Sequence, residues 1–271
     1  MLVTAKKKEQ KINPDIGSGW DYVKSEGHSG VIKCESWNGF LDFFHNKNAL
    51  RQNQNYVFRG HSSENWKLES TLKRKITETG VENAEKNILE TFQKHSLGRR
   101  GHNPPKLSES EWWALGQHFG LDTPLLDWSD SPFVAAFFAF NSESKETDNV
   151  VIWLLDKQIN NNEGVKKLKT QHHIEFLRPY LDENARLINQ RGLFVRTPNM
   201  ECITEWADCL KDEGIFHLVR ILIPRSEKDF ALDSLDKMNI NAFTLFPDVS
   251  GSAKYANYVV SRDAIKKNKD S

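Results

Sequence analysis

The apolar run NVVIWLLD, residues 149–156, constrains the fold more than any other stretch of the chain. Its interior contains no polar residue, and polar segments bound it on both sides. A strand with one solvated face alternates apolar and polar residues, whereas a strand covered on both faces reads as a continuous apolar run. The run therefore predicts a central strand of a β-sheet.

The rest of the chain mixes helices and strands without a regular strand–helix–strand period. Apolar residues at helical spacing predict helices at 37–44, 81–96, 109–119, 182–190, 201–210, 226–238 and 252–262, and one that begins at 132. Strands are expected at 31–34, 56–59, 125–127, 191–198 and 214–224, the last being the longest, and an extended segment at 241–251. This order favours an α+β fold with a mixed sheet over a doubly wound parallel sheet.

Local signals fix the ends of two of these helices. Ser108 followed by Glu111 forms the pattern of a capping box at the start of the helix that Gly120 ends. Ser131 and Pro132 occupy the N-cap and first helical positions of the next helix.

Length and charge limit the domain count and the partners. The chain has 271 residues, of which 38% are hydrophobic, enough for one sizeable core. We predict a single domain over residues 16–262 between charged tails at 1–15 and 263–271, which we expect to be mobile. Lys and Arg together number 37, as do Asp and Glu, so the zero net charge gives no overall attraction to nucleic acid or membrane. Any site for a polyanion must be local.

Several protein classes are disfavoured. The chain lacks a run of 18 apolar residues, and its beginning, MLVTAKKKEQK, lacks the apolar segment of a signal peptide, so we expect a cytoplasmic protein with no membrane partner. Cys34, Cys202 and Cys209 are an odd number without CxxC spacing, which argues against disulfides and zinc. GxGxxG, P-loop, HExxH, GxSxG and EF-hand patterns are missing, and we expect no metal.

Two strand ends carry unusual polar residues. Arg59 and Gly60 follow the apolar YVF, and Asp127 interrupts LLDW. Because a buried carboxylate needs a cation or several donors, we hypothesise that Arg59 and Asp127 form a bidentate pair. Two simpler interpretations stay open: Arg59 reaches water where its strand leaves the core, or the pair only ties two strands together.

Other polar residues lie at element boundaries or in loops. His118 ends a helix, Gln190 precedes GLF, and Asp248 follows LFP. Arg99 and Arg100 lie in the loop GRRGHNPP, where arginines are presented without burial, and they are the candidates for phosphate contact with nucleic acid.

Taken in order, the blocks YVFRGHSSENWKLESTLKR, WWALGQHFGLDTPLLDWSDSPFVAAFFAF, INQRGLF and FTLFPDVSGSAKY resemble the FRG domain family. The family takes its name from Phe-Arg-Gly, here Phe58, Arg59 and Gly60, and the resemblance extends from about Gly30 to Tyr258. FRG domains are similar to ADP-ribosyltransferases, which implies a split mixed sheet with flanking helices, NAD⁺ as co-substrate, and a toxin of bacterial toxin–antitoxin or anti-phage systems.

The resemblance also implies roles for residues. Gly60 would let NAD⁺ approach the backbone while Arg59 holds a ribose hydroxyl or phosphate. The same pocket would be formed by Phe58, His118, Trp128 and Ser129, with Gln117 beside His118 at its mouth. The catalytic group would comprise Arg59, Asp127, Gln190 and Asp248. Because the ExE pair of better-known transferases is missing, the candidates for the late catalytic position are Gln190, Glu201, Glu205 and Asp248, of which Asp248 best matches a family block.

Three functions follow as hypotheses. The first is an NAD-dependent ADP-ribosyltransferase toxin that modifies nucleic acid, RNA rather than DNA, and is neutralised by an antitoxin protein. The second is a binding domain without catalysis that senses a nucleotide or a phage component. The third, a nuclease, is the weakest, because neither a carboxylate cluster nor a histidine pair is spaced for metal catalysis.

Overall fold

The computed structural model describes residues 19–23, 29–46, 55–76, 81–142, 146–169, 172–179, 185–207, 210 and 217–269. In this part of the chain, eight strands form one mixed sheet in the order β1-β2-β8-β5-β3-β4-β7-β6. β2 and β8 pair in parallel, and all other neighbours pair antiparallel. The strands are β1 (Trp20–Val23), β2 (Ser29–Cys34), β3 (Tyr56–His61), β4 (Leu125–Ser129), β5 (Asn149–Asp156), β6 (Glu175–Leu177), β7 (Gly192–Arg196) and β8 (Leu218–Pro224).

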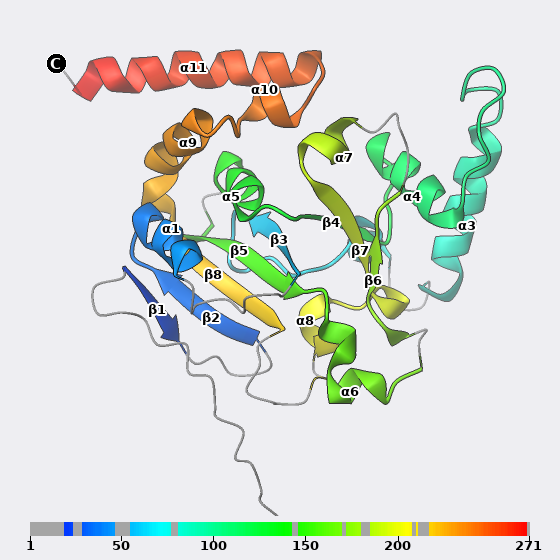
Figure 1. Ribbon diagram of the computed structural model, residues 1–271. Helices are drawn as coiled ribbons and strands as arrows, with labels where there is room; N and C mark the ends of the chain where they lie inside the picture. Colours follow the sequence, from blue (N-terminus) through cyan, green and yellow to red (C-terminus); the bar gives the residue numbers. More distant parts are fainter. Residues whose placement is uncertain are drawn as a thin grey trace, which may run out of the picture.

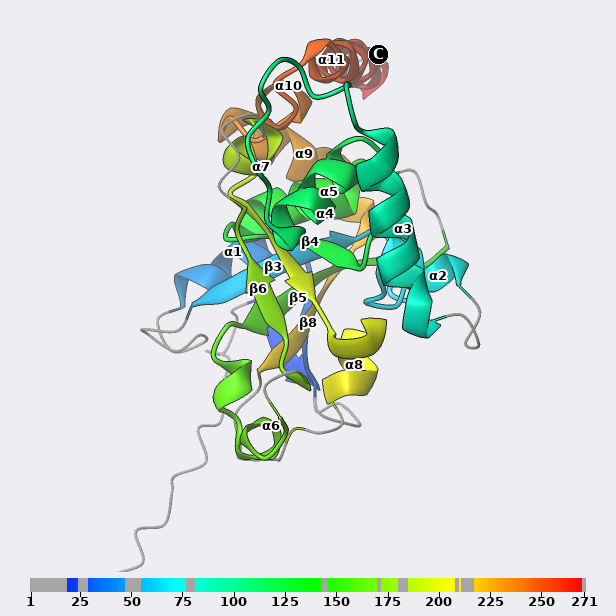
Figure 2. The ribbon, with the colours of Figure 1, turned by 90° about the vertical axis from the view of Figure 1, so that its right-hand side faces the viewer.

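Helices cover both faces of this sheet, so the fold is α+β as predicted (Figure 1). α1, α5 and α9 lie against one face, α6 and α8 against the other, and α3 and α4 beside β4, β7 and β6 (Figures 1 and 2). The helices of the described residues are α1 (Trp37–His45), α2 (Thr71–Lys75), α3 (Val81–His95), α4 (Glu109–His118), α5 (Pro132–Asn141), α6 (Glu163–Lys166), α7 (Ala185–Asn189), α8 (Ile203–Trp206), α9 (Lys228–Lys237), α10 (Ala242–Leu245) and α11 (Val249–Lys269).

The predicted central strand is β5. Its alternate residues Val150, Ile152 and Leu154 belong to the core beneath α1, α5 and α9, and the residues between them belong to the core on the opposite face. The continuous apolar run therefore has the predicted cause, burial on both faces. At eight residues β5 is also longer than β8, which has seven and had been expected to be the longest strand.

Both predicted helix starts are confirmed. Ser108 and Glu111 make the reciprocal bonds of a capping box at α4, and Ser131 accepts from the backbone amide of Val134 at α5. The Ser131 cap lies two residues after the end of β4, so α5 begins directly beyond that strand.

Other expectations differ from the structure. The segment predicted to be extended at 241–251 contains α10, because Asn241 and Thr244 form a second capping box, and then the start of α11. Glu227 rather than Ser226 precedes α9, and α8 is a single turn. α11 continues through the first residues predicted as a tail. The N-terminal tail and Cys209 lie outside the described residues.

The sheet is almost divided between β3 and β4. β3 pairs with β5 over its full length, and β4 pairs with β7 over its full length. Between β3 and β4 the register contains one pair, Phe58 with Ser129. Beyond that pair the two strands diverge, and the backbone groups that would have formed a ladder need other partners.

Gly60 lies on β3 directly beneath α5. A Cβ on Gly60 would overlap the carbonyl oxygen of Ala135 and would lie 2.7 Å from the amide nitrogen of Ala139. The close approach of a helix backbone is thus a packing reason for the glycine. The contact with NAD⁺ that the family resemblance implies for Gly60 stays a prediction.

We predict that Gly60→Ala lowers the free energy of unfolding by roughly 1–3 kcal/mol, because the obstructing atoms belong to a helix backbone that cannot rotate away. Urea denaturation measures the effect. Gly116→Ala is the matched control, since its Cβ meets only the flexible side chain of Leu121. Equal losses in the two variants would contradict this explanation.

Candidate functional site

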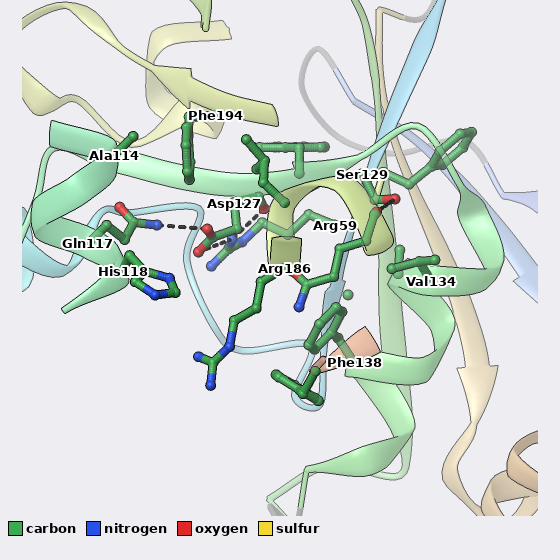
Figure 3. A pocket seen from close by; sticks show the side chains of 17 residues that line it. Arg59, Ala114, Gln117, His118, Asp127, Ser129, Val134, Phe138, Arg186 and Phe194 are labelled. Carbon is green, nitrogen blue, oxygen red and sulfur yellow. Dashed lines mark hydrogen bonds and ion pairs between the residues drawn. The ribbon is translucent and has the colours of Figure 1, made fainter. Parts of the chain in front are cut away.

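A cavity of about 370 Å³ opens where β3 and β4 diverge. Residues of β3, β4, β7, α4, α5 and α7, together with Phe246, form its walls (Figure 3). Aromatic residues supply much of the wall, among them Phe58, Phe138, Phe194 and Phe246. Its charged groups are Arg59, Asp127 and Arg186, and its neutral polar groups include two glutamine side chains. This combination suits a ligand that has both a flat ring and an anionic part.

Arg59 bridges the gap between the two diverging strands. Its Nη1 donates to the backbone carbonyl of Asp127 at 2.6 Å, and its Nε donates to Nε2 of His61 at 3.1 Å. A hydrogen bond from a charged donor contributes about 1.5–3 kcal/mol. The guanidinium therefore replaces the missing ladder between β3 and β4 and is held rigidly at the cavity wall.

The expected bidentate pair between Arg59 and Asp127 is wrong. The nearest carboxylate oxygen is 4.0 Å from Nη1, and the Asp127 side chain is 68% exposed rather than buried. Leu126 and Trp128 point into the core on one face of β4, so the residue between them points out of that core and into the cavity. Asp127 is therefore solvated by water rather than buried against a cation.

The Asp127 carboxylate is instead oriented by an amide. Gln117 Nε2 donates to Oδ1 of Asp127 at 2.7 Å, as Figure 3 shows. The hydroxyl of Thr123 donates to the other end of the same amide, which sets the orientation of Gln117. Asp127 is consequently an exposed carboxylate in a fixed position, with one oxygen bonded and the other directed towards Arg59.

His61 is buried next to Arg59 and must remain neutral. Trp153 Nε1 lies 3.3 Å from Nδ1 of His61, and Arg59 Nε lies 3.1 Å from Nε2. Both neighbours are donors, so the neutral ring accepts from one of them and a doubly protonated ring could accept from neither. Burial, with the charge of Arg59 second, lowers the pKa of His61 to about 3.

Arg186 enters the cavity wall from α7. Asp248 fixes it, accepting from Nε at 3.0 Å and from Nη2, and the guanidinium carbon lies 5.5 Å from the centre of the Phe246 ring. Asp248 also accepts from the backbone amides of Ser250 and Gly251 at the start of α11. The hydroxyl of Ser250, followed by Arg186, holds the pKa of Asp248 well below its usual range.

Gln190 and Ser129 connect the elements around the cavity. Ser129 Oγ donates to the backbone carbonyl of Gln190 at 2.7 Å, and Gln190 Nε2 donates to the carbonyl of Leu245 at 3.0 Å. Together they join β4, α7 and α10. Both line the cavity, but these bonds give them a structural role first.

The structure brings most of the candidate residues together and leaves three apart. The cavity wall contains Phe58, Arg59, Gly60, His118, Asp127, Trp128, Ser129 and Gln190. Asp248 does not line it and acts there only through Arg186. Arg99 and Arg100 do not line it either; Arg100 donates to the carbonyl of Pro105 and its guanidinium carbon lies 4.6 Å from the centre of the Trp112 ring.

Glu201 and Glu205, the other carboxylates considered, are also absent from the wall. Among the described residues, Glu69, Cys202 and Glu205 lie close enough to share a cation. Lys67 Nζ is 3.1 Å from Glu205 and 3.8 Å from Glu69, so an ammonium group already serves these two carboxylates.

Arg186 is a functional candidate that the sequence did not reveal, and three phenylalanines of the wall, Phe138, Phe194 and Phe246, were equally unmarked. Arg186 lies one helical turn before Gln190, a spacing that places both on the same face of a helix. That spacing was the available signal. It became meaningful only once Gln190 was known to face a cavity.

Comparison with known proteins supports part of the resemblance. The sequence model of the FRG domain matches residues 54–148, a shorter span than expected. The match covers β3, α4, β4 and α5, and with them Arg59, Gln117 and Asp127, whereas Arg186, Gln190 and Asp248 lie beyond it. No curated protein and no solved structure matches the chain. The described residues include no helix both long and apolar enough to cross a membrane.

We predict that the buried His61 makes the protein less stable as the pH falls. Its pKa is lower in the fold than in the unfolded chain, so between about pH 6 and pH 4 the unfolded state binds the extra proton. The free energy of unfolding should fall through this window by up to about 1.4 kcal/mol per pH unit from this group. Urea denaturation at several pH values measures the slope.

His61→Gln should give a shallower slope than the wild type, while His45→Gln, which changes an exposed histidine of α1, should not. Identical slopes in wild type and His61→Gln would show that His61 does not govern this dependence.

Proposed function

We propose that the cavity binds NAD⁺ and that the protein is an ADP-ribosyltransferase that cleaves the nicotinamide–ribose bond. The observation that carries the proposal is the fixed carboxylate of Asp127 beside the guanidinium of Arg59 at the division of the sheet. The FRG domain match contains both residues.

The residues of the cavity fit such a substrate. Its aromatic walls offer stacking surfaces for a planar ring, and Arg59 and Arg186 offer charge to a diphosphate. A volume of about 370 Å³ suits one half of a dinucleotide better than the whole molecule. The nicotinamide riboside half is the part that must be enclosed, because the reacting bond lies there.

Bond cleavage explains the need for an exposed but immobile carboxylate. When the bond between C1′ and the nicotinamide nitrogen breaks, its electron pair leaves with nicotinamide and neutralises the pyridinium. Positive charge then develops on the ribose, and a preorganised carboxylate stabilises it. A lone pair of the acceptor forms the new bond to C1′, and the acceptor's proton passes to water or to Asp127.

The other residues act by positioning. Gln117 holds the Asp127 carboxylate through the bond that Thr123 orients. Asp248 holds Arg186 at the wall, so its contribution is to substrate binding rather than to the chemical step. His61 remains neutral and keeps Arg59 in place without adding a second positive charge.

The acceptor and the biological role follow from the family resemblance. We propose nucleic acid as the acceptor, RNA ahead of DNA, and a toxin in bacterial toxin–antitoxin or anti-phage defence, with an antitoxin protein as partner. Growth arrest on expression of the wild type, but not of an inactive variant, would test the toxin role separately from the chemistry.

We predict that the protein releases nicotinamide from NAD⁺ and that Asp127→Asn slows this reaction by about 10²–10³-fold. The variant should fold normally, because the Asp127 side chain is mostly exposed. Chromatography measures nicotinamide, and NAD⁺ labelled in its adenylate phosphate, incubated with cellular RNA, DNA and protein, identifies the acceptor.

Asp248→Asn should raise the KM for NAD⁺ more than it lowers kcat. Asp229→Asn, at an exposed position of α9 that does not line the cavity, should change neither. Binding of intact NAD⁺ without nicotinamide release would favour the sensing domain instead. Unchanged turnover in Asp127→Asn would remove the proposed role of this carboxylate.

A further inference from the structure

A second cavity, of about 210 Å³, lies beside the first. Arg59, Gln117 and Asp127 line both, so this group of three residues forms a shared wall. The other residues of the second cavity belong to α2 and the residues just before it, to the segment between α4 and β4, and to the start of β4. They include Glu69, Arg74, Asp122 and Leu125. None of the large aromatic residues of the first cavity lines it.

Lysines outside the second cavity partly offset the charge of its carboxylates. Two of the three carboxylates have such a partner: Asp122 lies 2.8 Å from Lys75, and Glu69 lies 3.8 Å from Lys67, which also bonds Glu205 at 3.1 Å. Asp127 is the third, and one of its oxygens accepts from Gln117. Two guanidiniums therefore face a single carboxylate that has no lysine partner.

Arg74 and Arg59 line the same cavity and carry like charges. After burial, which lowers the pKa of Arg59, and Asp127, which raises it, the charge of Arg74 lowers it further. Arg74 itself is exposed and uses Nη1 to bond the carbonyl of Glu69 at 2.7 Å. Two positive charges that line one cavity repel each other, but both attract an anion that lies between them.

We propose that the second cavity is a phosphate subsite in which Arg74 is the principal cation and Arg59 is shared with the first cavity. A phosphate or diphosphate group would accept from both guanidiniums, as planar forks of donors allow. The site explains why a second arginine lines this small cavity together with Arg59, an arrangement that the first cavity alone does not require.

Two sources could supply this phosphate. One is the diphosphate of the dinucleotide whose other half occupies the first cavity. The other is the backbone of a nucleic acid acceptor, which would then approach the ribose from the opposite side of Asp127. Binding at the subsite does not require turnover, so it stands or falls independently of NAD⁺ cleavage.

The test is isothermal titration of the full chain with inorganic pyrophosphate, followed at the ligand by ³¹P NMR. Arg74→Gln should weaken binding about tenfold or more, and high salt should weaken binding to the wild type. Lys73→Gln is the matched control, since it removes the same charge from the same helix but does not line the cavity.

Two further ligands separate the sources. Competition between ADP-ribose and pyrophosphate, with ADP-ribose also weakened by Arg74→Gln, would assign the subsite to the dinucleotide. Simultaneous binding of both, with a 5′-phosphorylated RNA dinucleotide displacing pyrophosphate, would assign it to the acceptor. Equal pyrophosphate affinity in wild type, Arg74→Gln and Lys73→Gln, or no binding at millimolar concentration, would overturn the proposal.

Discussion

The guanidinium of Arg59 replaces a β-ladder. Two strands that pair fully with their outer neighbours meet at a single residue pair, and beyond it the carbonyl of Asp127 has this side chain as its hydrogen-bond donor. A charge-assisted bond can hold such a junction, yet a side chain leaves more room than a strand would. The sheet is thereby kept together and opened at the same place, and the cavities occupy the opening.

One cation consequently serves several purposes that constrain one another. Arg59 is buried enough to hold the two strands together, and the negative charge of Asp127 counteracts the effect of that burial on its pKa. It also lines both cavities, where a ligand can reach it. Neutral His61 supports it from the interior, and Asp127 balances it from the solvent side at 4.0 Å, too far for a strong ion pair. A weak pair leaves both groups available to a substrate.

Sequence patterns predicted what local physics determines. The capping box at Ser108 and the apolar run of β5 each depend on neighbours in the sequence, and both were found where expected. The orientation of Asp127 depends on Gln117 of α4. The packing reason for Gly60 depends on the backbone of α5, which lies far along the sequence from β3. Asp248 was judged from its family block, whereas its actual partners, Arg186 and the start of α11, could be known only from the fold. The sequence thus indicated which residues matter more reliably than how they act.

The most direct test of Arg59 is its own Nε–H resonance in ¹⁵N-correlated NMR, assigned by its loss in Arg59→Lys. A proton held between Arg59 and His61 should exchange slowly with water and shift when NAD⁺ is added. That result would support both the bridging bond and its exposure to a ligand. A rapidly exchanging resonance, or one that NAD⁺ leaves unchanged at saturation, would contradict the central role given to this side chain.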